Sequence, residues 1–416
     1  MTTALSAENT IAQTVADLER DHLIQSYLRP PFVLERGKGC FVYDTAGKRY
    51  VDFISGIGVN AMGHGHPRIL KAMREQIAKL IHCSNLYYHP YQGPLAERLA
   101  KISGLQRAFF ANSGAEAMEG ALKIIKAWGR KIDPEKYEIV ALNHSFSGRT
   151  TSAISITGTA KYRQPFEPLL PGVRFIDREN IDALREAVND RTAGIVIEPI
   201  LGEGGIHEVS REFAQEVLSL ANKHNALVLF DEIQCGLGRT GSYFAYQAWN
   251  RPTEGNSLPK TIVPDIITVA KPLACGLPMG AILANDRAAG MITPGLHGST
   301  FGGNALACRV ALEFLDLLEE TMPAVRETGE YFARRLEELV LKYDFVTGVR
   351  GRGLMLGLIL NVPGKSVVTQ LTERGFLINC TADTVLRFLP PYIIEPKHID
   401  QLVAALDDIF RAGPPA

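Results

Sequence analysis

The sequence lacks the long apolar runs, the one-sided charge and the targeting signals that mark several large classes of protein. No stretch of its 416 residues approaches the roughly 18 uninterrupted apolar residues of a membrane-spanning helix, so we expect no membrane span. The 44 basic and 45 acidic residues give a formal net charge of −1 without a long run of one sign, which argues against a nucleic-acid partner. The first 22 residues have neither an apolar core nor an Arg-rich pattern, which predicts no secretory or transit peptide.

Closely spaced cysteine pairs are also absent. The six cysteines, at positions 40, 83, 235, 275, 308 and 380, are scattered and form no CxxC motif. They predict reduced thiols in a cytoplasmic protein, with neither a disulfide framework nor a metal site. What the chain does have is length and apolar content: 46% of its residues are hydrophobic, enough for a large core and more than one domain.

From residue 107 onward, short apolar runs alternate with segments of helical spacing. This alternation predicts crossover connections and a mostly parallel sheet, and hence an α/β fold. The predicted strands are Ala108–Ala111, Glu138–Leu142, Val173–Phe175, Gly194–Ile197, Ala226–Phe230, Ile266–Ala270 and Met279–Ala284, the last of which could run antiparallel. Helices are predicted, among others, at Thr10–Arg20, Glu116–Lys131, Asn304–Glu320 and Ala324–Lys342. We expect an N-terminal arm and part of a small domain at 1–66, a large domain at 67–305, and a small C-terminal domain at 306–416.

The segment 226–271 places two charged side chains where predicted strands end. The run 226–230 stops at Asp231, and the run 266–270 stops at Lys271. In open α/β sheets ligands bind outside the carboxyl ends of the strands, so an acid and an amine are predicted to reach one crevice. A lysine that loses its proton is a good Schiff-base nucleophile, and a carboxylate suits a cofactor with a basic ring nitrogen. Pyridoxal phosphate (PLP) needs both groups; a surface lysine and a capping aspartate are the simpler alternative.

Four further loops carry groups that could bind a ligand, and each also has a simpler explanation. The loop at 112–117 precedes a helix, so its free N–H groups could bind an anion, or its serine could be an ordinary N-cap. The loop at 144–150 offers an aromatic ring and an arginine, or a core side chain and a solvated charge. The loops at 198–205 and 298–303 offer a glutamate and several hydroxyls, or plain turns. Because all four lie at ends or entry points of predicted sheet elements, coincidence is the weaker explanation.

Together these motifs resemble those of the class III aminotransferases, PLP-dependent enzymes of fold type I. The similarity covers the chain from about residue 25 to residue 411. It rests on Asn112–Ala117, Phe146–Thr150, Glu198–Gly205, Phe230–Gln234, Ala270–Lys271 and Gly298–Asn304. The resemblance implies a large, mostly parallel PLP domain, a smaller α+β domain from the C-terminus and part of the N-terminus, and a homodimer with shared active sites.

The resemblance also implies roles for individual residues at the cofactor. Lys271 would bind PLP covalently and later move a proton, and Asp231 would keep the ring nitrogen protonated. Phe146 would stack on the ring, and Gln234 would lie near the ring hydroxyl. The other implied cofactor contacts are Ser113, Gly114 and Ala115 at the phosphate, Glu232 and Ile233 beside Asp231, and Thr300 from the neighbouring subunit.

Substrate handling follows from the same resemblance. Arg149 and Arg387 match the two arginines that grip the carboxylates of glutamate. The other substrate reacts through a side-chain amine and has no carboxylate beside the reacting carbon, so Arg387 would be a costly unpaired charge. Glu203 would neutralise Arg387 in one half-reaction and move away in the other. Ser299 is expected beside the substrate and Tyr27 near the distal end of the amine.

The implied reaction transfers the terminal amine of N2-acetyl-L-ornithine to 2-oxoglutarate, giving N-acetyl-L-glutamate 5-semialdehyde and L-glutamate in arginine biosynthesis. Ornithine, 4-aminobutyrate, succinylornithine and succinyldiaminopimelate stay open as donors, because Ser147, Leu201 and Pro272–Gly276 depart from the family pattern near the pocket. An NAD-dependent dehydrogenase is the alternative of another class, but no GxGxxG run with its following acid has the right spacing. A non-catalytic PLP-binding protein is the third alternative.

Overall fold

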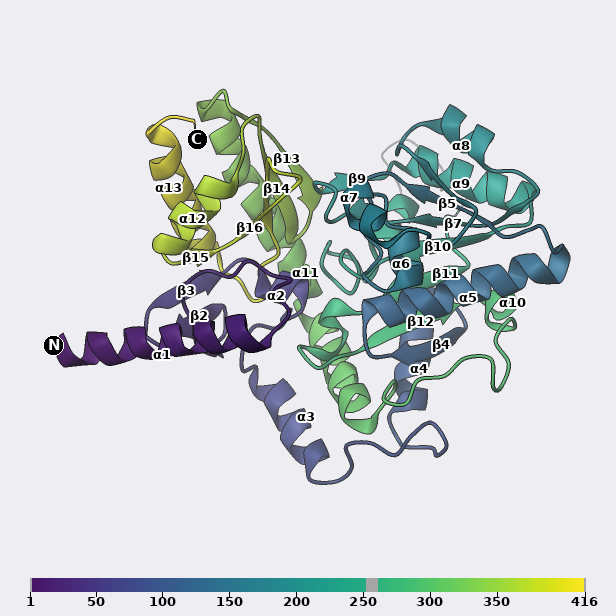
Figure 1. Cartoon of the computed structure of the whole chain (residues 1–416), viewed down its shortest axis with the longest axis horizontal. Coiled ribbons are helices and arrows are strands. Elements are labelled where there is room, and N and C mark those ends of the chain that lie inside the picture. Colours follow the sequence, from purple (N-terminus) through teal and green to yellow (C-terminus); the bar gives the residue numbers. More distant parts are fainter. Residues whose placement is uncertain (1, 252–260, 415–416) are drawn as a thin grey trace.

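The computed structural model describes residues 2–251 and 261–414, and it divides into two halves that meet along one long helix (Figure 1). The larger half is built on a seven-stranded sheet in the order β4-β12-β11-β10-β7-β5-β6. In that order the strands are Arg107–Ala111, Gly280–Ala284, Ile266–Val269, Leu227–Asp231, Thr192–Ile197, Glu138–Leu142 and Val173–Ile176. Every predicted strand of the sheet is present, with bounds within one or two residues of the expectation.

Strand direction places the carboxyl ends of β10 and β11 side by side. β10 runs parallel to β11 and β7, and β5 runs parallel to β6 and β7. β12 is antiparallel to both β11 and β4, which settles the direction that the sequence left open. Asp231 belongs to β10, where it pairs in register with Thr268 of β11, rather than following the strand as expected.

Helices cover both faces of this sheet (Figure 1). The most central is α5 (Gly114–Ile132), whose apolar side chains, such as Met118 and Ile125, are fully buried. It begins where it does because Ser113 is an N-cap that accepts the Glu116 N–H at 3.1 Å. The other helices of this half are α3 (Pro67–Ile77), α4 (Gln92–Ser103), α6 (Thr151–Ser155), α7 (Ala160–Arg163), α8 (Ile181–Ala187), α9 (Arg211–Lys223) and α10 (Asp286–Ala289). Short 3-10 turns lie at Gln164–Phe166 (η1), Ala245–Asn250 (η2) and Lys271–Ala274 (η3).

The smaller half combines segments from both ends of the chain. One four-stranded sheet joins β1 (Leu34–Lys38), β2 (Phe41–Asp44) and β3 (Arg49–Asp52) to β15 (Phe376–Leu377). A second contains β13 (Val346–Arg352), β14 (Met355–Leu360), β17 (Val385–Phe388) and β16 (Asn379–Thr381). Helices α2 (Ser55–Gly58), α12 (Lys365–Glu373) and α13 (Pro396–Arg411) complete it. A short hairpin, β8 (Ile200–Leu201) and β9 (His207–Glu208), leaves the larger half and approaches β13.

The prediction of two separate helices at 304–320 and 324–342 was wrong. The structure has one helix, α11 (Ala305–Lys342), with Pro323 inside it. Proline removes one backbone donor, but Pro323 is exposed, so water can satisfy the freed carbonyl group. Met322 and Val325, on either side of it, are buried in the core, and this packing keeps the helix continuous.

The N-terminal helix is also longer than expected, because α1 spans Thr2–His22 rather than 10–20. It extends away from the body of the molecule (Figure 1). None of the helices within residues 2–251 and 261–414 is long and apolar enough to cross a bilayer. The division at 66/67 and 305/306 stays a prediction.

Candidate active site

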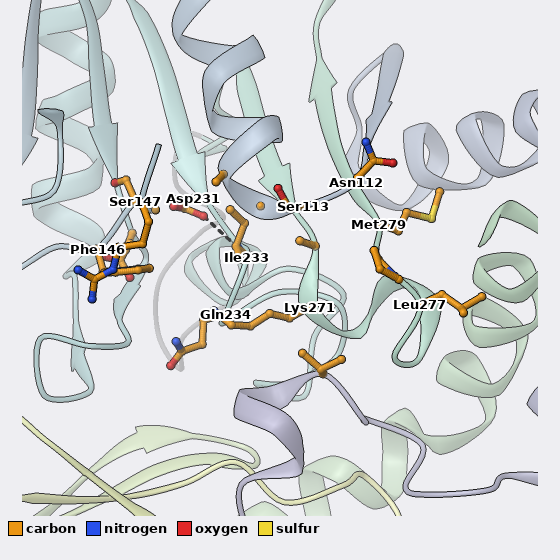
Figure 2. Close-up of a pocket in the computed structure, with 18 of the residues that line it drawn as sticks. Asn112, Ser113, Phe146, Ser147, Asp231, Ile233, Gln234, Lys271, Leu277 and Met279 are labelled. Atoms are coloured by element: carbon orange, nitrogen blue, oxygen red, sulfur yellow. Dashed lines mark hydrogen bonds between the residues drawn. The ribbon is translucent and has the colours of Figure 1, made fainter. Parts of the chain in front are cut away.

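A cavity of about 470 Å³ opens at the carboxyl ends of β10 and β11, where α5 begins. Its volume is typical of small-molecule sites. Figure 2 shows Lys271 across the middle, with Asp231 and Ser113 on one side and Gln234 near the tip of the lysine. The predicted site residues that line the cavity are Ser113, Gly114, Ala115, Phe146, Arg149, Asp231, Ile233, Gln234 and Lys271.

Asp231 and Lys271 come from adjacent parallel strands and enter this one cavity. The Asp231 carboxylate accepts hydrogen bonds from the Ile233 N–H and the Thr268 hydroxyl, each at 3.1 Å, which fixes its orientation. Burial raises the pKa of Asp231 to about 6, although these donors and Lys271 oppose the shift. Burial lowers the pKa of Lys271, against the attraction of Glu203. Among residues 2–251 and 261–414, no group hydrogen-bonds to Lys271 Nζ, so the amine is free to react.

The first turn of α5 is shaped to receive an anion. The N–H groups of Gly114 and Ala115 line the cavity and have no acceptor within the described residues, while the N–H groups of Glu116 and Ala117 are bonded to Ser113. A Cβ on Gly114 would lie 2.8 Å from Ile233 Cδ1, so any larger residue here would displace the Ile233 side chain. Free N–H groups and the positive end of a helix favour a phosphate at this position.

Glu198, which directly follows β7, lines the cavity and holds two of its loops. Its carboxylate accepts the N–H of Phe146 at 2.8 Å and the N–H of Gly202 at 3.1 Å. Burial and the neighbouring Asp231 raise the pKa of Glu198 to about 8. The cavity therefore has two adjacent buried carboxyl groups, and a cationic ring nitrogen between or beside them would relieve their cost.

On the opposite wall, Phe146 and Arg149 come from the loop after β5. The Arg149 guanidinium lies 4.0 Å from the ring centroid of Tyr162 and 5.3 Å from that of Phe146. Arg149 is exposed and forms no ion pair with a carboxylate in the described part of the chain. These cation–π contacts hold its charge at the mouth of the cavity, where a substrate carboxylate could reach it.

A second charged cluster lies behind Gln234. The Glu203 carboxylate is 2.5 Å from Nη1 of the fully buried Arg387 and also accepts the amide of Gln234 at 3.2 Å. Arg387 donates in addition to Gln234 Oε1 at 3.0 Å and to the Gly202 carbonyl at 3.2 Å. Burial raises the pKa of Glu203, but Arg387 outweighs it, so the pKa is below its ordinary value and the pair is charged. Gln234 is the bridge between this pair and the cavity.

Besides Glu203 and Arg387, four predicted site residues do not line the cavity. The Glu232 carboxylate faces away from it and accepts the N–H groups of Ala245 and Tyr246 at 2.9 and 3.0 Å, so it anchors the η2 turn. Thr300 is exposed, and Tyr27 is 73% exposed. Ser299 is next to the lining, since its hydroxyl accepts the side-chain amide of Asn112 at 3.1 Å.

Several residues at the cavity had no role in the sequence-based prediction. Glu198 could have been predicted from the sequence, because it is a charged residue directly after a predicted strand, as Lys271 is. Thr268 could not, because it lies within β11 and nothing in the sequence distinguishes it from its neighbours. The remaining lining residues without a predicted role are Val59, Asn112, Ser147, Gly148, Ala270, Gly276, Leu277, Pro278 and Met279. No group of three His, Cys, Asp or Glu side chains within the described residues is arranged to hold a metal ion.

Comparison with known proteins agrees with this geometry. The family model "Aminotransferase class-III" matches residues 24–410. The chain is 46% identical to the acetylornithine aminotransferase of Methanocaldococcus jannaschii over 409 residues, which are 98% of this chain and 99% of that protein.

Two solved structures are similar over nearly the whole chain. Ornithine aminotransferase from Toxoplasma gondii, described as having partial occupancy of PLP at its active site, has a TM-score of 0.88 and 32% identity, covering 96% of this chain and 94% of that one. Acetylornithine aminotransferase from Elizabethkingia anophelis has a TM-score of 0.83 and 32% identity, covering 95% and 98%.

Proposed function

The chain belongs to the class III aminotransferase family, and on that premise we propose that it transfers the terminal amino group of N2-acetyl-L-ornithine to 2-oxoglutarate. One observation carries the proposal: the amine of Lys271 and the carboxylate of Asp231, from adjacent strands, share one cavity with the open N-terminus of α5. The family relation makes the protein a PLP-dependent aminotransferase. The choice of donor and the role of each residue are our proposal.

The residues present fit PLP. The unpaired N–H groups of Gly114 and Ala115, with the Ser113 hydroxyl, suit its phosphate, and Asp231 suits its ring nitrogen. When bound, the cofactor supplies a conjugated cationic ring that withdraws electrons from the substrate carbon. Asp231 holds the proton on the ring nitrogen, which also lets this buried carboxylate ionise. Phe146 and Ile233, which line the cavity, would cover the ring, and Gln234 would support its hydroxyl.

Lys271 is the residue that binds the cofactor and moves the proton. Burial lowers the pKa of Lys271, which favours the neutral amine that a nucleophile and general base require. Because no described group hydrogen-bonds to Nζ, the amine can move between the cofactor and the substrate carbon without breaking a contact.

The Glu203–Arg387 pair determines which substrate is admitted. When the terminal-amine donor is bound, Glu203 neutralises Arg387 and avoids a buried unpaired charge. When 2-oxoglutarate enters, Glu203 moves away, and Arg387 and Arg149 each bind one carboxylate. Ser299 lies beside the substrate, next to Asn112. Two observations support this proposal. The Glu203 carboxylate lies 2.5 Å from Nη1 of Arg387, and Arg149 is exposed and has no carboxylate partner among the described residues.

Acetylornithine is the proposed donor because it is the substrate in the name of the relative that is 46% identical. Ornithine is the second candidate, since a structurally similar protein with 32% identity is an ornithine aminotransferase. Assays of each donor with 2-oxoglutarate would decide between them. A higher kcat/KM for ornithine or 4-aminobutyrate than for acetylornithine would refute our choice.

A homodimer is also part of the proposal. Large apolar side chains are exposed near the cavity loops, among them Leu86, Tyr87, Tyr88, Leu296 and Phe301. A partner subunit would cover them and bring its Thr300 to the phosphate; for Tyr27 we keep the distal-amine contact. Sedimentation would show a monomer if this is wrong. The six free cysteines support the proposed cytoplasmic location, which fractionation of cells would test.

Replacing Lys271 with Ala tests the central assignment. Turnover should fall by about 10⁴-fold or more, because both the covalent attachment and the proton transfer are lost. Borohydride reduction followed by mass spectrometry should place the cofactor on Lys271 in the wild type and on no residue of the variant. Unchanged turnover, or a reduced adduct at another lysine, would refute the proposed function.

A further inference from the structure

The hairpin that carries Glu203 has one histidine that lies within hydrogen-bond distance of an arginine from each half of the molecule. Glu203 lies in the turn between β8 and β9, and His207 opens β9. Nη2 of Arg178, in the loop after β6, is 2.7 Å from His207 Nδ1. Nη1 of Arg350, in β13 of the smaller half, is 2.8 Å from His207 Nε2. β9 accordingly lies between the two halves in Figure 1.

His207 is suited to accept hydrogen bonds but not to be charged. Burial and the guanidinium groups of Arg350 and Arg178, together with His144, lower the pKa of His207 to about 4. A neutral imidazole has a single acceptor nitrogen. Its tautomer therefore decides whether the hairpin is bonded to the larger half through Arg178 or to the smaller half through Arg350. Either tautomer keeps the hairpin attached.

Other contacts hold the rest of the hairpin. Glu208 forms an ion pair with Arg352, and the Gly205 carbonyl accepts from Arg350 at 3.3 Å. On the turn itself, the Glu203 carbonyl accepts the hydroxyl of Thr381. The backbone of the turn is thus held at Glu203 and at Gly205. A fixed backbone lowers the entropy cost of keeping the Glu203 carboxylate, which is 29% exposed, on Arg387.

We propose that His207 is a positioning residue: by anchoring the hairpin it keeps Glu203 on Arg387 and so limits how readily the site admits a dicarboxylate. This inference rests on the function proposed above for the Glu203–Arg387 pair. Loss of the anchor loosens the turn, weakens that pair and exposes Arg387 to dicarboxylates. The anchor therefore shifts the preference between the amine donor and glutamate without touching either substrate.

The test is His207→Phe, which keeps a ring of similar size and removes both nitrogens. The matched control is His224→Phe, because His224 also has a polar contact, to Asp190 at 2.8 Å, but lies at the end of α9. Glutarate, a dicarboxylate without an amine, is titrated into each holoenzyme and its Kd is read from cofactor absorbance. We expect about fivefold tighter binding in His207→Phe and no change in His224→Phe.

A second measurement separates positioning from mere stability. The ratio of kcat/KM for L-glutamate to kcat/KM for the terminal-amine donor should rise about fivefold in His207→Phe. An unchanged glutarate Kd and an unchanged ratio would overturn the inference, whatever happens to Tm. If this variant does not fold, the double variant Arg178→Met/Arg350→Met removes both anchors instead, and a wild-type Kd there would equally overturn it.

Failure of the proposed function would look different. In that case the wild type would transaminate none of the donors. The glutarate Kd values of wild type, His207→Phe and Glu203→Gln would still report on the hairpin. Glu203→Gln sets the limit, since it removes the carboxylate that neutralises Arg387, and the Kd of His207→Phe should fall between that of Glu203→Gln and that of the wild type.

Discussion

The proposed cofactor side of the cavity and the Glu203–Arg387 pair, our proposed gate, are built in opposite ways. The cofactor side combines the ends of strands in one sheet with the start of α5, and contacts between residues close in the chain hold part of it, such as the Ser113 cap of α5. The gate combines side chains from two halves: Glu203 from the β8–β9 hairpin, Gln234 after β10, and Arg387 in β17. The cofactor side therefore depends on the larger half alone, while the gate depends on how the two halves of the molecule pack together.

This difference has a functional consequence. A PLP enzyme needs a rigid cofactor site but must accept two unlike substrates in turn. Rigid groups at the tips of a buried sheet suit the first task, and a contact between two halves suits the second, because small relative movements change it. Substitutions on the cofactor side should therefore reduce activity with both substrates, while substitutions at the gate should affect one substrate more than the other.

The largest effect is expected on the cofactor side. In Asp231→Asn the ring nitrogen loses its anionic partner, so kcat should fall by about 10²–10³-fold with either substrate. Steady-state kcat, together with kcat/KM for each substrate as a measure of its half-reaction, tests this. Asp265→Asn is the control, because Asp265 is also buried but bonds to Val228, Asn285 and Arg287 away from the cavity. A loss confined to one half-reaction would contradict the shared role of Asp231.

At the gate the effect should fall on one substrate. Arg387→Met removes the charge that binds one carboxylate, so kcat/KM for 2-oxoglutarate should fall by about 30-fold to 10³-fold. The half-reaction with the amine donor should change far less, because Glu203 no longer needs to neutralise the arginine. Single-turnover absorbance traces separate the two halves. Equal losses in both would show that Arg387 supports the fold rather than the dicarboxylate.

The smallest effect is on stability and its pH dependence. The pKa of Glu198 is about 8 in the folded protein and near 4.5 when unfolded, so the folded state holds a proton that the unfolded state loses. The cofactor-free protein should lose stability as pH rises from about 5 to 8, because the unfolded state gives up this proton first. In Glu198→Gln this decline should be shallower above pH 6, and in the exposed control Glu212→Gln it should be unchanged. Urea titrations across this range measure it, and a parallel decline in Glu198→Gln would contradict the assignment.

The sequence located many of the residues that line the cavity because the signals that mark them are local. A charge directly after an apolar run marked Asp231 and Lys271, and a serine before a helical segment marked the start of α5. Glu232 carried the same signal but faces η2, because the side chains of neighbouring residues in a strand point in opposite directions. A sequence pattern can locate a charged residue at the end of a strand, but it does not show on which face of the sheet the side chain lies.

Predictions that depended on packing were less successful. Pro323 indicates a helix end in the sequence, yet α11 continues through it because Met322 and Val325 are buried on the same element. For Thr300 and Tyr27 the sequence motifs gave a role, but in a single chain both are exposed. Their contacts stay predictions that require a second subunit.

By itself the sequence determined the family and the positions of Asp231 and Lys271 at strand ends, because these depend on neighbours along the chain. Only the tertiary structure decided that Glu198 lies beside Asp231, that Glu203 reaches Arg387, and that His207 lies between arginines of the two halves. Those contacts span tens to nearly two hundred residues, and they form only when separately folded layers pack. The pKa shifts of Glu198, Glu203 and His207 depend on which groups lie near them in space, and the spacing of residues along the chain does not reveal those neighbours.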